Sequence, residues 1–227
     1  MRVFDHLLYW RDSRGRGGAE NMAVDEALMA NMTQHPILRI YDWSEPSVSF
    51  GYFHSMEEAR LAFPSSEECP VHYVRRWTGG GIVDHRHDLT YTLAVPRACE
   101  LAHQRGTASY QIIHQALGRA LKTLGQEVVL SDDDQGSGSV CFEHAVAHDL
   151  ASGQGEKIAG AGQRRTRHGL LHQGSLLTEV DPDVLGPEFA NQLAGDWSEW
   201  AAGSSFEQEV AQLTAKRYAT SGWLLKR

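Results

Sequence analysis

The chain has 227 residues, a length that fits one large domain or two small ones and can bury a core without disulfides or metal ions. Its net charge of −8 argues against a general nucleic-acid binder, which would carry a basic field. Three widely spaced cysteines form no C-x-x-C pair, so neither a disulfide framework nor a zinc knuckle is predicted, and a cytoplasmic location is expected. The first residues do not resemble a signal peptide, and no apolar run of about 18 residues is present, so no membrane association is expected.

Apolar spacing and turn residues outline the elements in chain order. Periodic apolar positions predict helices at residues 21–32, 109–124 and about 206–218. Short β-prone runs predict strands at residues 38–41, 48–50, 71–75, 89–95 and 128–130, with a hairpin-like pair at 157–160 and 170–178. Thr107 or Ser109 is the expected cap of the second helix. Only one strong crossover helix is visible, which favours an α+β fold with mixed sheets and packed helices over a doubly wound parallel sheet.

The segment RRWTGGG at residues 75–81 is the most informative part of the chain. Three consecutive glycines let a backbone approach a ligand closely, and Arg75 and Arg76 offer planar donors for a carboxylate or phosphate. The following run at 89–95 alternates apolar residues with threonine and alanine, so we expect one apolar and one mixed face. The pattern predicts a binding turn held against a sheet, with a plain β-turn as the alternative. It lacks the Gly-Lys-Ser/Thr ending of a phosphate-binding loop.

Cys141 and Lys157 are the candidate reactive residues. A cysteine is more often a small buried hydrophobe than a nucleophile. Cys141, however, follows a glycine- and serine-rich segment and precedes a lone lysine in a glycine-rich context. A nearby cation favours a thiolate, and a lysine can also donate to an acyl oxygen as charge develops there. Cys69 and Cys99 have no such neighbours and are interpreted as structural.

The histidines and one basic run are further candidate binding residues. The 12 histidines include no His-Glu-x-x-His motif, and no metal site is predicted. The run QRRTRH at residues 163–168 is basic within an acidic chain. It is either a solvated loop or a contact for a phosphate or an acidic partner.

Taken together, several segments resemble the lipoate–biotin protein ligase superfamily, in the branch of lipoate-protein ligase A and the cysteine-dependent octanoyltransferases. The matching pieces are NMAVD at 21–25, LRIYDW at 38–43, VSFGYF at 48–53, the glycine segment through residue 91, KIAGAGQRR at 157–165 and LHQGSLL at 171–177. His54 is a departure, because family members usually have glutamine there.

The resemblance implies one catalytic domain over residues 1–227 without a C-terminal accessory domain, with a fold related to biotin ligases and class II synthetases. It also implies a tunnel for a medium-length acyl chain, which is delivered to a lysine of a lipoyl carrier domain. Lys157 would contact the acyl carbonyl or an adenylate phosphate. The substrate site implied by the matching motifs comprises Arg76, Thr78, Gly79, Gly80, Gly81, His85, Gly160 and Gln163.

Two enzymatic interpretations and one binding interpretation follow. In the favoured one, Cys141 takes an octanoyl group from acyl carrier protein as a thioester and passes it to the carrier lysine, with no cofactor. In the second, ATP and Mg²⁺ support an acyl-adenylate intermediate in a lipoate-protein ligase, and Gly81 favours this alternative because octanoyltransferases often have arginine there. The third is a non-catalytic acyl- or carrier-binding homologue. The basic residues at 164–167 could meet an acidic carrier domain electrostatically.

Overall fold

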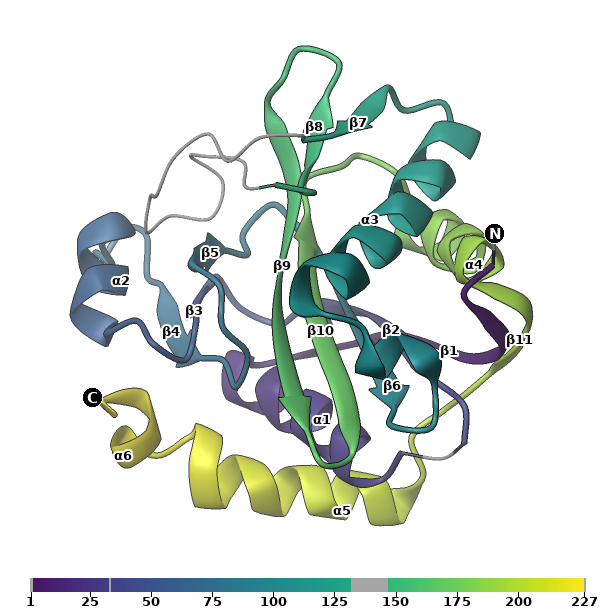
Figure 1. Ribbon diagram of the computed structural model, residues 1–227. Helices are drawn as coiled ribbons and strands as arrows, with labels where there is room; N and C mark the ends of the chain where they lie inside the picture. The colour runs from purple at the N-terminus through teal and green to yellow at the C-terminus, as the bar shows by residue number, and fades with distance from the viewer. Residues whose placement is uncertain (1, 33, 132–146, 227) are drawn as a thin grey trace.

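A computed structural model describes residues 2–32, 34–131 and 147–226 of the chain (Figure 1). Its strands are β1 (Phe4–Arg16), β2 (Ile37–Trp43), β3 (Ser47–Phe50), β4 (His72–Arg75), β5 (Ile82–Asp84), β6 (Leu89–Pro96), β7 (Val128–Leu130), β8 (Leu150–Ser152), β9 (Lys157–Thr166), β10 (Gly169–Leu176) and β11 (Ala194–Glu199). Its helices are α1 (Gly18–Ala30), α2 (Met56–Ala62), η1 (Glu100–His103), α3 (Gly106–Thr123), α4 (Pro182–Leu193), α5 (Ser204–Leu213), η2 (Thr214–Tyr218) and α6 (Ser221–Leu224).

The strands form two mixed sheets. The larger sheet has eight strands in the order β11-β1-β2-β6-β10-β9-β8-β7, and the smaller one has the order β4-β3-β5. In the larger sheet β11, β1 and β2 are parallel neighbours, whereas the strands from β2 to β7 pair antiparallel. In the smaller sheet β3 is parallel to β4 and antiparallel to β5. This arrangement confirms the predicted α+β fold.

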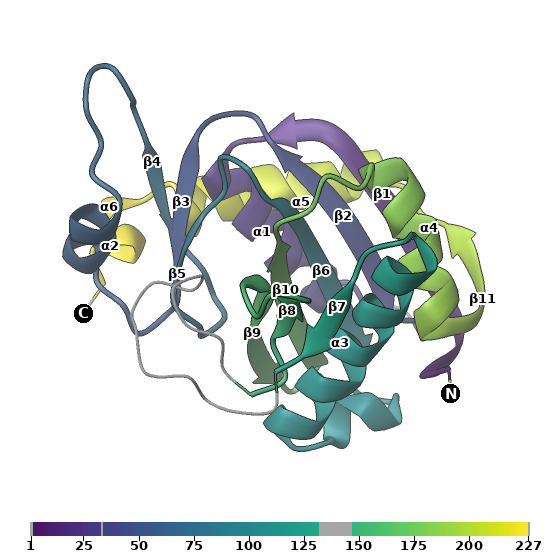
Figure 2. The ribbon, with the colours of Figure 1, turned by 90° about the horizontal axis from the view of Figure 1, so that it is seen from above.

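Helices cover both faces of the larger sheet. Figure 2 shows α3 and α4 on one face and α1 and α5 on the other. Leu117 of α3 and Phe189 of α4 belong to one apolar cluster, and Met22 of α1 and Phe206 of α5 belong to another. Within the described parts of the chain, no helix is both long enough and apolar enough to span a bilayer.

The central strand β6 is buried on both faces. All eight of its residues are buried, including the threonines of the predicted mixed face. Thr90 and Thr92 tolerate this burial because each hydroxyl has a partner. Thr90 Oγ1 accepts from Trp43 Nε1 at 2.8 Å, and Thr92 Oγ1 donates to Asp25 Oδ2 at 2.8 Å. Burial of a hydroxyl is inexpensive only when such a hydrogen bond replaces water.

Local sequence explains where several helices begin. Ser55 and Glu58 form a reciprocal capping box at α2, and the Asp181 side chain caps α4 immediately before Pro182. The predicted cap of α3 is wrong. That helix begins at Gly106, and Ser109 lies inside it, where its hydroxyl contacts Gln163 Oε1 at 3.0 Å.

The longest strand among the described residues, β1, was not predicted, because an unbroken apolar run at Leu7–Trp10 gives way to a charged second half without strict alternation. Two of its charged residues, Asp12 and Arg16, are buried. Their charges are compensated internally. Asp12 Oδ2 accepts from Arg16 Nε at 2.9 Å and from Arg39 Nη2 at 2.6 Å. Ion pairing thus permits these two charged side chains to be buried in the strand, which hydrophobic periodicity alone cannot reveal.

Candidate functional site

The glycine turn joins β4 to β5 and is enclosed by backbone on two sides. A Cβ on Gly51 would lie 2.0 Å from the carbonyl oxygen of Gly80, and a Cβ on Gly162 would lie 2.3 Å from that of Gly79. Gly80 itself has φ +90°, a conformation that favours glycine. Glycine is therefore required at three points where β3, the turn and β9 meet. The predicted glycine turn therefore lies against the sheets as expected, and its role in binding stays a prediction.

Arg76 stabilises this turn through hydrogen bonds to its backbone. Its Nη2 donates to the carbonyl oxygens of Gly79 at 3.2 Å and Gly81 at 2.7 Å, and its Nη1 donates to Ser49 Oγ at 2.7 Å. The guanidinium is nearly buried. Because the planar fork has several fixed donors, it can hold a turn and a neighbouring strand at the same time.

The hydrogen bonds of Arg76 continue through a polar line of three side chains: Ser49, His85 and Asp88. His85 Nδ1 lies 2.8 Å from Asp88 Oδ2, and His85 Nε2 lies 2.6 Å from Ser49 Oγ. A carboxylate only accepts, so in the neutral imidazole the proton is on Nδ1 and Nε2 accepts the Ser49 hydroxyl. Asp88 Oδ2 also accepts from the Ser175 hydroxyl of β10. The line therefore connects both sheets through buried polar groups.

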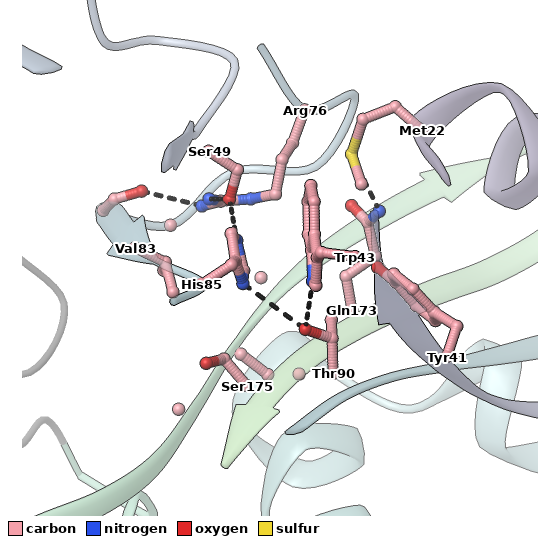
Figure 3. Close-up of a pocket in the computed structure, with 16 residues that line it drawn as sticks. Met22, Tyr41, Trp43, Ser49, Arg76, Val83, His85, Thr90, Gln173 and Ser175 are labelled. Atoms are coloured by element: carbon pink, nitrogen blue, oxygen red, sulfur yellow. Dashed lines mark hydrogen bonds between the residues drawn. The ribbon is translucent and has the colours of Figure 1, made fainter. Parts of the chain in front are cut away.

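Aromatic residues close the same region. The Trp43 and His85 rings are stacked, with centroids 4.0 Å apart and an interplanar angle of 18°. The Trp43 indole is also fixed by its hydrogen bond to Thr90, and Figure 3 shows the Trp43, His85 and Thr90 side chains next to one another in the pocket lining. This wall combines an apolar surface with a few oriented polar atoms, the usual composition of a small-molecule site.

The pocket bounded by these groups is a narrow, partly open cleft with a cavity volume of about 20 Å³, which is room for about one water molecule. Its lining comes from both sheets and α1 (Figure 3): Met22, Tyr41, Trp43, Ser49, Arg76, Gly80, Gly81, Val83, His85, Thr90, Gly160, Ala161, Gly162, Gln173, Gly174 and Ser175. Five of the candidate substrate-site residues, Arg76, Gly80, Gly81, His85 and Gly160, are among them.

The other three candidate residues lie elsewhere around the turn. Thr78 is buried and donates to Gln173 Oε1 at 2.6 Å, and Gln173 Nε2 in turn donates to Asp25 Oδ2 at 2.6 Å. Gly79 and Gln163 line a second groove on the other side of β9. The two hollows share Gly80, Ala161 and Gly162, so the glycine contact separates them.

Lys157 is the first residue of β9 and forms a salt bridge in a nearly buried position. Its Nζ lies 2.7 Å from Asp149 Oδ2, and the side chains of Lys157 and Asp149 are 5% and 0% exposed. Neither residue lines the two hollows described above. Cys141 lies outside the described residues, so its predicted role and its proximity to Lys157 remain predictions.

Arg75 does not have the anion-binding role expected from its sequence. It is buried, and its donors bind the backbone carbonyl oxygens of Tyr52, His54, Trp223, Leu224 and Lys226 at 2.5–3.1 Å. This arginine therefore fastens the C-terminal segment to the smaller sheet. Nothing in the local sequence distinguishes it from Arg76.

The basic run after Gly162 is divided by strand alternation. Arg164 packs over the Trp77 ring with its guanidinium carbon 4.5 Å from the centroid, whereas Arg165 donates to Ser109 Oγ of α3 at 2.7 Å. Successive side chains of a strand point to opposite faces, so these two arginines do not form one patch. Arg167 is exposed near the hairpin turn.

Sequence reasoning missed Ser49, Asp88, Asp149 and Tyr110 as members of the site. Their importance arises from contacts between distant segments, which no local motif signals. Among the residues that the structure describes, no group of three His, Cys, Asp or Glu side chains is arranged to hold a metal ion.

The comparisons with known proteins agree with this architecture. A sequence profile described as "Lipoyl protein ligase A/B catalytic domain" matches residues 18–215, and the chain belongs to this family. It is 35% identical over 193 residues to "Octanoyltransferase LipM" of Carboxydothermus hydrogenoformans, covering 81% of this chain and 67% of that protein. It is also 35% identical over 189 residues to "Octanoyltransferase LipM" of Symbiobacterium thermophilum, covering 78% and 68%. The chain thus spans about two thirds of the length of these relatives.

Two solved structures share the fold. Lipoate-protein ligase A bound with ATP has a TM-score of 0.71 at 22% identity, over 99% of both chains. A bi-partite lipoate protein ligase from Thermoplasma acidophilum, described together with its E2 lipoyl domain, has a TM-score of 0.66 at 19% identity, over 100% of this chain and 99% of that one.

Proposed function

We propose that this protein is an octanoyltransferase of protein lipoylation. The observation that carries the proposal is the 35% identity to octanoyltransferases over about four fifths of the chain. The mostly apolar surface of the pocket at the glycine turn is of the kind that an acyl chain packs against. The acyl acceptor in this proposal is a lysine of a lipoyl carrier domain, and the donor is acyl carrier protein.

The proposed reaction has two acyl-transfer steps. The Cys141 thiol gives up its proton, and the resulting thiolate attacks the carbonyl carbon of the octanoyl thioester. The bond from that carbon to the carrier sulfur breaks, and the carrier sulfur takes up a proton and leaves as the thiol. The amine of the acceptor lysine then attacks the Cys141 thioester, forming an amide and regenerating the thiol. Lys157 donates a hydrogen bond to the acyl oxygen as that oxygen gains negative charge. No cofactor enters this scheme.

The alternative is an ATP-dependent ligase, which Gly81 favours. There the acyl group is activated as an adenylate with ATP and Mg²⁺, and Cys141 has no chemical role. The two schemes differ in whether an acyl-enzyme forms without nucleotide.

Intact-mass measurement distinguishes them. The protein is mixed with octanoyl–acyl carrier protein in the absence of ATP, beside Cys141→Ala and, as a control cysteine, Cys99→Ala. We expect one added octanoyl group in the wild type and in Cys99→Ala, and none in Cys141→Ala. Acylation of a lipoyl domain only with ATP and free octanoate would instead establish the ligase. Absence of both reactions would leave the binding homologue.

A further inference from the structure

The Lys157–Asp149 salt bridge is part of a larger buried arrangement at the start of β9. Asp149 precedes β8, and its second oxygen accepts the hydroxyl of Tyr110 from α3. The Tyr110 oxygen in turn accepts from the backbone N–H of Ala161 at 2.9 Å. One carboxylate thus connects Lys157 to a helix and to the segment of β9 beside the glycine turn.

The backbone next to Asp149 is held in an unfavourable conformation. His148 has φ +72°, the only positive φ among the described residues that are not glycine. Such a conformation costs about 1–2 kcal/mol for an L-residue. The His148 carbonyl oxygen accepts from His114 Nδ1 at 2.7 Å, and the His148 N–H donates to the Ser131 carbonyl oxygen at 2.8 Å. Strained residues persist where surrounding contacts over-determine them, often at functional sites.

The same groups border the glycine turn. Tyr110 and His148 line the second groove together with Gly79 and Gly80. The Asp149 carboxylate therefore sits behind the wall of this groove, with its two oxygens directed to Lys157 and to Tyr110. The Asp149 side chain is fully buried and does not line the groove, but it can fix the position of the Lys157 ammonium.

We propose that Asp149, fixed by Tyr110 and by the strained turn at His148, is the positioning residue for Lys157. This inference rests on the proposed function, in which Lys157 donates to the acyl oxygen. A lysine side chain has many rotamers, and a salt bridge to a rigid carboxylate restricts the ammonium to one location.

Kinetics of octanoyl transfer to a lipoyl domain test the assignment. Asp149→Asn keeps the size and an acceptor oxygen for Tyr110 but removes the charge. We expect its kcat to fall on the order of 10- to 100-fold, with KM for the octanoyl donor within about twofold, because misplacement of a donor affects the reacting geometry. Tyr110→Phe leaves the salt bridge in place and should lower kcat by a smaller factor.

Glu26→Gln is the matched control. Glu26 also accepts from an arginine and a tyrosine, Arg217 Nη1 at 2.5 Å and Tyr218 OH at 2.6 Å, but it lies on α1. Its substitution should leave kcat unchanged. A folded Asp149→Asn protein with wild-type kcat would overturn the inference. If that variant does not fold, wild-type kcat in Tyr110→Phe would overturn it equally.

A measurement independent of activity separates this inference from the proposed function. The labelling rate of Lys157 by an amine-reactive ester, followed by peptide mass spectrometry, should rise several-fold in Asp149→Asn, because the salt bridge that holds the ammonium is lost. The labelling rate of the exposed Lys122 should stay the same. An unchanged Lys157 rate contradicts the positioning role. Failure of the wild type to transfer octanoate contradicts the proposed function and leaves the labelling result to decide the role of Asp149.

Discussion

Gly162 of β9 contacts the carbonyl oxygen of Gly79 so closely that a Cβ on Gly162 would lie only 2.3 Å from it. We expect Gly162→Ala to displace the turn and to lower the free energy of unfolding by about 1–3 kcal/mol, the usual effect of overpacking. Gly79→Ala is the control, since nothing lies within 4 Å of a Cβ there. Chemical denaturation of both variants checks this. Equal stability of the two would refute the close contact.

Ser49→Ala tests the polar line behind the pocket. The substitution removes an acceptor of Arg76 Nη1 and the partner of His85 Nε2, both in a buried setting. The loss should lower the free energy of unfolding by about 1–3 kcal/mol. Ser198→Ala, at an exposed position, should be close to neutral in the same denaturant titration. A neutral Ser49→Ala would show that solvent or other side chains replace these contacts.

Arg75→Lys tests the attachment of the C-terminal segment. A lysine has one nitrogen and cannot reach carbonyl oxygens from both the 52–54 and 223–226 segments, as the Arg75 fork does. Amide hydrogen exchange at residues 221–226 should become faster, with a stability loss of about 1–3 kcal/mol. Arg86→Lys, whose arginine pairs with Asp84 near the surface, should leave this exchange unchanged. Unaltered exchange in Arg75→Lys would mean that packing of Trp223 suffices.

Histidine burial gives the protein a predictable acid sensitivity. Burial lowers the pKa of His114 from 6.5 to about 4 and that of His172 well below its ordinary value. The unfolded chain therefore binds these protons first as the pH falls, and stability should decrease from about pH 7 towards pH 4. His114 alone contributes roughly 3 kcal/mol to this decrease.

The variant His114→Asn should reduce that pH dependence, because its amide can still donate to the His148 carbonyl but takes up no proton. The exposed His87→Asn is the control. Free energies of unfolding measured by denaturant between pH 4 and pH 7 provide the comparison. Identical slopes for wild type and His114→Asn would contradict a neutral, buried His114.

Local pattern was sufficient for some parts of the site and insufficient for others. The glycine turn and the β9–β10 hairpin could be located because glycine runs and alternation are local properties. The different roles of Arg75 and Arg76 could not be predicted, because each role depends on which distant residues hydrogen-bond to the guanidinium group. Asp88 and Asp149 were equally hidden, since a single carboxylate becomes informative only when tertiary contacts supply its partners. The charged second half of β1 was missed as well, because its buried Asp12 and Arg16 have partners that only the tertiary structure supplies.

The contact of the glycine turn with Gly51 and Gly162 also determines which parts of the pocket are open to change. At Gly51 and Gly162 an added Cβ would overlap the backbone of the turn, so substitution at these two positions alters the fold before it alters the ligand. The opposite wall is built from side chains, including Met22, Tyr41 and Trp43. Divergence in ligand length or shape, whether by evolution or by engineering, is therefore confined to that side-chain wall.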